Sequence, residues 1–133
     1  FGLGKLYSVP IYRLMARHLS ENGALVVQST SPWFAPRSFW CIDATLREAG
    51  FHTHPYHAYV PSFGEWGFNL ATRRPGYTPP TAYSIPTRFL DGETTRLMFR
   101  FPPDMKPLPV EANHLNNQRL VHYFEQDWGN VVR

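Results

Sequence analysis

The sequence predicts an α/β fold that corresponds to the second half of a doubly wound sheet, closed by an antiparallel hairpin and followed by an irregular tail. Three observations lead to this prediction. Helical and strand patterns alternate through the first half of the 133 residues, a five-residue link joins the last two predicted strands, and most of the 13 prolines follow Pro55. The glycine-rich cofactor turn near the start of such a sheet is not in this sequence.

The first predicted helix starts at Ser8, and the first predicted strand covers residues 24–28. Ser8 is a suitable N-cap, and Pro10 falls in the first turn, where its missing N–H costs no hydrogen bond. The expected inner face consists of apolar residues at helical spacing: Ile11, Leu14, Met15 and Leu19. Gly23 is expected to end this helix. Residues 24–28 are apolar without alternation, which predicts a strand buried on both faces.

A second helix is predicted from Pro36 to Gly50, and a hairpin follows it. Its inner face should carry the apolar residues Phe39, Ile42, Leu46 and Ala49. Residues 51–60 and 66–73 are then predicted as strands, and the short link over residues 61–65 favours an antiparallel pair. In the second strand, Trp66, Phe68 and Leu70 should share one face, and Gly67, Asn69 and Ala71 the other.

The pattern changes after Arg74. Residues 75–87 contain four prolines and are predicted to be an extended surface segment. A short helix is expected within residues 92–101, and a last helix over residues 115–128 is indicated by Leu120, Phe124 and Trp128 at four-residue spacing. We therefore divide the chain into residues 1–74, a half-domain, and residues 75–133, a proline-rich and helical tail packed on it.

The composition argues against several classes of function. The net charge is +3 and no run of Lys and Arg occurs, so nucleic acid is not an expected partner. Cys41 is the single cysteine, which leaves no internal disulfide. No stretch approaches the apolar length of a membrane span. A cytoplasmic location is expected, and membrane anchoring of the longer parent protein stays open as an alternative. The chain begins with Phe1 rather than Met, which indicates a piece of a longer protein.

Four segments, in order, resemble the C-terminal part of the spermidine synthases, the polyamine aminopropyltransferase family. Gly4–Ser8 with Ile11–Arg13 is similar to the segment after the family's catalytic loop, and residues 24–32 are similar to the next strand and its substrate-facing end. Residues 60–68 are similar to the hairpin beside the polyamine. Residues 101–105 and 115–121 are similar to a bacterial subgroup whose longer members have an N-terminal membrane region. The resemblance covers the whole chain. It implies a methyltransferase-like Rossmann fold.

The resemblance also implies a reaction. In this family, an amine of putrescine attacks the methylene beside the sulfonium of decarboxylated S-adenosylmethionine, which is the co-substrate, and spermidine and methylthioadenosine result. The family's catalytic aspartate and nucleoside-binding segments correspond to positions before Phe1. This chain is therefore expected to bind no cofactor, to contribute no catalytic residue and to be inactive alone, while providing the polyamine side of the site.

The resemblance points to five substrate-binding candidates in this chain. Gln28 and Ser29 stand at the carboxyl end of the first strand, where open α/β sheets bind ligands. Phe63 stands where typical spermidine synthases have a tyrosine. Because Phe63 has no hydroxyl to contact an amine, putrescine is uncertain as the substrate. The rings of Phe63 and Trp66 can still attract a cation. Glu65 is the only carboxylate of this loop and a candidate for an amine contact.

Each candidate also has a purely structural explanation. Gln28 and Ser29 can satisfy backbone groups at a strand end, Phe63 and Trp66 can cover the core, and Glu65 can be a solvated turn residue. Tyr7 and Tyr12 are further candidates for the pocket wall, with helix packing as the alternative for Tyr12.

No metal or nucleophile site is predicted. His52 and His54 share one face of a strand and His57 lies on the other, so the three side chains should not converge on a metal. Cys41 lies in the second predicted helix and is expected to be an inert buried side chain.

Two alternative functions stay open, a non-catalytic binding or assembly module on the same scaffold and a methyltransferase that uses intact S-adenosylmethionine. A half-sheet exposes a strand edge and apolar faces. We therefore expect the chain to form homo-oligomers or to pair with the missing N-terminal half, with a polyamine as the small-molecule partner.

Overall fold

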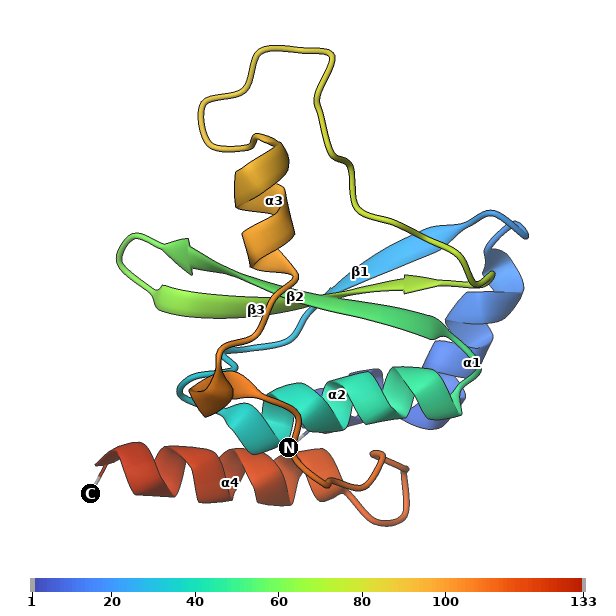
Figure 1. Cartoon of the computed structure of the whole chain (residues 1–133). Coiled ribbons are helices and arrows are strands. Elements are labelled where there is room, and N and C mark those ends of the chain that lie inside the picture. The colour runs from blue at the N-terminus through green and yellow to red at the C-terminus, as the bar shows by residue number, and fades with distance from the viewer. Residues whose placement is uncertain (1, 133) are drawn as a thin grey trace.

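A computed structural model describes residues 2–132, with side chains from Gly4 to Gly129. The elements in order are η1 (Gly2–Tyr7), α1 (Val9–His18), β1 (Ala24–Gln28), α2 (Pro36–Glu48), β2 (His52–Val60), β3 (Gly64–Thr72), α3 (Gly92–Met98), η2 (Pro103–Met105) and α4 (Arg119–Val132), where η marks a 3-10 helix. Figure 1 shows α2 beneath the sheet and α4 on the outer side of α2. The predicted Rossmann-like α/β fold is confirmed.

The three strands form one sheet in the order β1-β3-β2. Both β1 and β2 run antiparallel to β3, with Gln28 opposite Phe68 and Val60 opposite Gly64, so β1 and β2 run parallel to each other. The hairpin turn is shorter than predicted and covers residues 61–63 only. Ser62 and Gly64 have φ angles of 78° and 80°, which let the chain reverse within this short turn.

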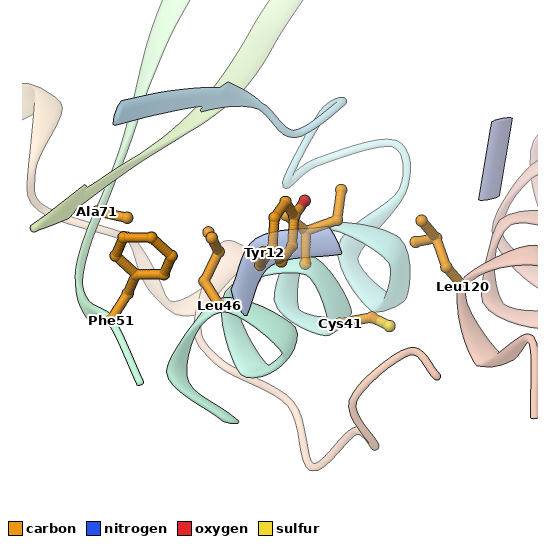
Figure 2. Close-up of a cluster of buried hydrophobic side chains, with 7 residues drawn as sticks. Tyr12, Cys41, Leu46, Phe51, Ala71 and Leu120 are labelled. Carbon is orange, nitrogen blue, oxygen red and sulfur yellow. The ribbon is translucent and has the colours of Figure 1, made fainter. Parts of the chain in front are cut away.

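Helix α2 forms as predicted, because its sequence marks both ends. Pro36 occupies the first turn, and Gly50, at φ 104°, takes the left-handed conformation that ends the helix. Phe39, Ile42 and Leu46 are buried beneath the sheet. Figure 2 shows Leu46, Phe51 and Ala71 close together, with Tyr12 beside them and Cys41 and Leu120 further along the same core cluster.

The predicted inner face of α1 is wrong. Leu14 and Met15 are 47% and 41% exposed, whereas Val9 and Tyr12 are buried. Helix α1 packs against α2 along the side that carries Tyr12 and Ala16, which turns Leu14 and Met15 outward. Gly23 does not end the helix either, since α1 stops at His18.

Strand β1 lies where it was predicted, but it is not buried on both faces. Leu25 and Val27 are half-buried, whereas Ala24, Val26 and Gln28 are exposed. Leu25 and Val27 pack against the core, and within the described residues no comparable layer covers the opposite face of β1. In that same part of the chain, β1 pairs only with β3, so its outer edge has no strand partner.

The two faces of β3 differ as the alternation predicted. Gly67, Asn69 and Ala71 are buried on the α2 side, and Asn69 donates a hydrogen bond from Nδ2 to Asp43 Oδ1 of α2 at 2.9 Å. On the opposite face, Phe68 stacks on Tyr56 of β2 with ring centroids 5.2 Å apart.

The tail begins with an extended segment over residues 75–87, as predicted, which projects away from the sheet in Figure 1. Helix α3 follows, with Asp91 accepting a 2.7 Å hydrogen bond from the Thr94 amide at its N-terminus. Helix α4 starts at Arg119, four residues later than predicted, because Asn117 Oδ1 accepts hydrogen bonds from the His114 and Arg119 amides and holds a turn before the helix.

Two buried polar side chains fasten the tail to the first half of the chain. Asn113 donates from Nδ2 to the carbonyls of Gly4 and Tyr7 in η1, both at 2.9 Å, and accepts at Oδ1 from the Leu120 amide of α4 at 3.0 Å. Asp127 of α4 accepts at Oδ2 from the Ser38 amide and hydroxyl of α2. Among residues 2–132, no helix is both long and apolar enough to cross a membrane.

Candidate functional site

A pocket of about 630 Å³ opens beside the carboxyl end of β1. Its walls come from η1, from the segment that follows β1, from α2, from the start of β3 and from α4. The residues that line it are Gly4, Tyr7, Gln28, Thr30, Ser38, Ile42, Trp66, Leu120, Val121, Phe124, Glu125 and Trp128. The carboxyl end of a strand is where open α/β sheets bind ligands, and this pocket has that position.

The chain between β1 and α2 is held in an unusual conformation at this pocket. Thr30 has a φ angle of 59°, which is uncommon for a β-branched residue, and its carbonyl accepts a 2.6 Å hydrogen bond from the Gly67 amide. The Ser31 hydroxyl then accepts hydrogen bonds from the Trp33 and Phe34 amides. These bonds fix the wall between the end of β1 and the start of α2.

The structure separates the two candidates at the end of β1. Gln28 is exposed and lines the pocket, so its amide is available to a ligand. Ser29 is fully buried, does not line the pocket, and donates its hydroxyl proton to the Val27 carbonyl at 2.9 Å. The hydroxyl of Ser29 therefore serves the backbone of the strand end.

The hairpin candidates are also separated. Trp66 lines the pocket, while Phe63 lies outside its lining, is 65% exposed and meets the Trp66 ring edge-on, with centroids 5.9 Å apart. Glu65 does not line the pocket and points to the face of β3 opposite that of Trp66. Its carboxylate lies 2.8 Å from His57 Nδ1 on β2.

Most residues of the pocket wall were not among the sequence candidates. Tyr7 was considered and does line the pocket, whereas Tyr12 is packed in the core, where burial raises the pKa of its phenol. The spacing of Leu120, Phe124 and Trp128 indicated one face of a helix. It did not indicate that this face lines a pocket. Glu125 and Thr30 carried no sequence signal for a pocket.

The chemistry of the pocket favours a ligand that combines an apolar chain with a positively charged group. Four aromatic rings, those of Tyr7, Trp66, Phe124 and Trp128, line it. Glu125 is the only Asp, Glu, Lys, Arg or His among the lining residues in the described chain. Aromatic faces and a carboxylate both attract ammonium groups, while the rings also pack against methylene chains.

No metal site forms from the described residues. The three histidines of β2 do not converge, since His57 bonds to Glu65 and to the Arg100 carbonyl, whereas His54 lies 3.4 Å from the Thr72 hydroxyl. Cys41 is buried, and its burial raises the pKa of the thiol to about 12, which keeps the sulfur protonated and unreactive at neutral pH.

Comparisons with known proteins agree on one family. Residues 3–78, more than half of the chain, match the model of the spermine/spermidine synthase domain. Polyamine aminopropyltransferase 2 of Ralstonia nicotianae is 63% identical over 134 residues, covering 100% of this chain, and the polyamine aminopropyltransferase of Leptospira interrogans is 43% identical over 99% of it. The crystal structure of spermidine synthase from Thermotoga maritima matches with a TM-score of 0.61 at 18% sequence identity. The match covers 73% of this chain and 36% of that one, and it shows the same fold.

The chain spans 26% of the length of the two curated relatives. The matched region covers 100% and 99% of this chain. The fold, the matched domain and these relatives together establish that the chain belongs to the spermine/spermidine synthase family.

Proposed function

We propose that the complete protein carrying this chain transfers an aminopropyl group from decarboxylated S-adenosylmethionine to putrescine or a related amine, and that this chain provides the wall that binds the acceptor amine. The observation that carries the proposal is the pocket at the carboxyl end of β1, with its four aromatic rings and one carboxylate, in a member of this family.

The reaction makes specific demands on the acceptor site. The neutral amine nitrogen attacks the methylene carbon beside the sulfonium, a C–N bond forms, and the C–S bond breaks as methylthioadenosine leaves with the electron pair. The nitrogen then loses a proton to a base, which we assign to a part of the complete protein outside this chain. The acceptor site must therefore align an apolar chain that carries charge at one end, and alignment for attack is a large part of the rate enhancement.

The pocket meets these demands through residues of different elements. Trp66 of β3 and Tyr7 of η1 contribute aromatic rings to the lining, and Gln28 contributes a neutral amide at the strand end. Together, they can pack a methylene chain and orient an amine. The proposal assigns Gln28 and Trp66 to the amine wall and leaves Ser29, Phe63 and Glu65 outside it.

A transfer assay on the complete protein tests the proposal. We expect decarboxylated S-adenosylmethionine and putrescine to give spermidine and methylthioadenosine, detected by mass spectrometry. Methyl transfer from intact S-adenosylmethionine would instead support the methyltransferase alternative. Neither activity with any diamine would favour the non-catalytic module.

Calorimetric titration of the 133-residue chain complements that assay. We propose that the chain is inactive alone, because an acceptor wall without the nucleoside site and base does not assemble a reaction. No saturable heat with methylthioadenosine, putrescine or spermidine is expected. Tight binding of a polyamine to the chain alone would favour a binding module. We also propose that the complete protein is located in the cytoplasm. As part of the same proposal, this chain associates with a second chain or with an N-terminal segment.

A further inference from the structure

One wall of the pocket comes entirely from helix α4, in the tail that follows the matched domain at residues 3–78. The five α4 residues that line the pocket are Leu120, Val121, Phe124, Glu125 and Trp128. Their spacing of one, three and four residues places them on one face of the helix. The helix therefore presents a continuous surface to the pocket, in which Glu125 is the only charged residue.

This wall is fixed in place at both ends. Near the start of α4, Asn113 joins the Leu120 amide to the carbonyls of Gly4 and Tyr7, so α4 and η1 keep a fixed separation across the pocket. Near its end, Asp127 binds the N-terminus of α2 through the Ser38 amide at 2.9 Å. A wall that is already ordered loses little conformational entropy when a ligand binds.

The aromatic part of the wall is ordered as well. The Trp128 ring stacks on Phe34 with centroids 6.5 Å apart, and Phe124 lies 5.8 Å from it on α4. The indole Nε1 of Trp128 is buried without a protein acceptor in the described chain. Trp128 and Phe124 thus form an apolar surface next to Glu125.

Glu125 itself has no hydrogen bond or ion pair to any residue that the structure describes. Seven other ion pairs occur there, including that of Glu111 with Arg119, the first residue of α4. An exposed carboxylate at the rim of an aromatic pocket is suited to an ammonium ion. Its partner is therefore expected in the ligand.

We propose that Glu125 binds the non-reacting ammonium group of a diamine acceptor, while Phe124 and Trp128 pack against its methylene chain. The proposal rests on the proposed aminopropyl transfer. The reacting nitrogen must be neutral to attack, so a charged group at the rim can select only the opposite end of the acceptor. Glu125 is then the residue that distinguishes a diamine from a monoamine of the same length.

The test compares E125Q with the unchanged complete protein, using putrescine and n-butylamine as acceptors. Gln keeps the size and helix propensity of Glu and removes its charge. We expect the KM for putrescine to rise about tenfold or more, as for the loss of a charge-assisted hydrogen bond. The inhibition constant or KM of n-butylamine should stay within about twofold, since this amine has no second ammonium for an ion pair.

E93Q is the matched control, because Glu93 is an exposed helical glutamate of α3 that pairs with Arg96 and does not line the pocket. It should leave both amines unaffected, and E125D should recover part of the putrescine affinity. An unchanged KM for putrescine in E125Q, or an equal loss for both amines, would overturn the assignment of Glu125.

Calorimetric binding of putrescine to the complete protein separates this proposal from the proposed function. If no aminopropyl transfer occurs but E125Q still weakens putrescine binding about tenfold, the Glu125 site stands and the enzyme assignment fails. If transfer occurs and E125Q binds putrescine as the unchanged protein does, only the Glu125 site fails.

Discussion

Asp127 shows how a single side chain can join two distant segments. Its carboxylate is fully buried and accepts from the Ser38 amide and hydroxyl at 2.9 and 2.8 Å and from the Arg37 guanidinium at 3.3 Å. Ala35, the N-cap residue of α2, has no side-chain acceptor, so Asp127 of α4 serves as the missing cap. Its negative charge also complements the positive end of the α2 dipole.

Replacing Asp127 by Ala should destabilise the chain by about 2–4 kcal/mol, because buried donors of Ser38 lose their acceptor and the Arg37 side chain loses its counter-ion. D127N should cost about half of that, since the amide keeps one acceptor oxygen. Urea unfolding measures both changes. E125Q, two residues earlier on the same helix, serves as the control for loss of charge and should change the free energy of unfolding by less than about 0.5 kcal/mol. A similar small change in D127A would contradict the capping role.

At the scale of elements, the contact between β3 and α2 depends on the absence of a side chain at Gly67. A Cβ atom there would overlap the Phe39 ring and lie 2.8 Å from the Thr30 carbonyl oxygen. Phe39 cannot move aside easily, because it is fully buried and packed edge-on against Trp40, with centroids 4.9 Å apart. The sheet can approach α2 this closely only with glycine at this position.

The substitution G67A should therefore destabilise the chain by about 1–3 kcal/mol through overpacking. G129A provides the matched control, since a Cβ on Gly129 of α4 meets nothing within 4 Å. Alanine is the better helix former, so G129A should stabilise by up to about 1 kcal/mol. Thermal unfolding of both variants checks the prediction, and a neutral G67A would mean that the α2–β3 contact is looser than the structure indicates.

At the scale of the whole molecule, β1 and α1 both expose apolar side chains. Val26 is 54% exposed on a strand whose outer edge has no partner in the described chain, and Leu14 and Met15 of α1 are turned outward. An open strand edge with apolar side chains is a template for pairing with another strand. We therefore propose that this surface associates with another chain segment, either from a second copy of the chain or from another part of the complete protein.

Light scattering across a concentration series tests this association. We expect the 133-residue chain to form dimers or larger species, and V26K to shift the distribution towards the monomer, because a lysine on a strand edge opposes pairing. Lysine in place of the exposed Ile85, in the tail segment away from the sheet, is the control and should leave the distribution unchanged. A monodisperse monomer of the unchanged chain at all concentrations would refute the prediction.

Elements with local sequence signals could be predicted without the structure. Pro36 and Gly50 mark the ends of α2, alternation from Trp66 to Ala71 identifies β3 and its two faces, and the prolines of residues 75–87 exclude regular structure. The four segments that resemble spermidine synthases also identified the family, because their residues and their order along the chain can be read without the structure. These features follow from backbone preferences and side-chain periodicity, which act within a few residues.

The inner face of α1 and the lining of the pocket could not be predicted, because both depend on how distant segments pack together. The spacing of α1 allowed Leu14 and Met15 as the inner face, but α2 packs on the side of Tyr12 and Ala16. Glu65 had the chemistry of an amine ligand, but its face of β3 directs it to His57, whereas Glu125, which had no sequence signal, lies at the pocket. The reason is that a pocket is built from residues far apart in the chain, and only packing brings Gln28, Trp66 and α4 to the same place.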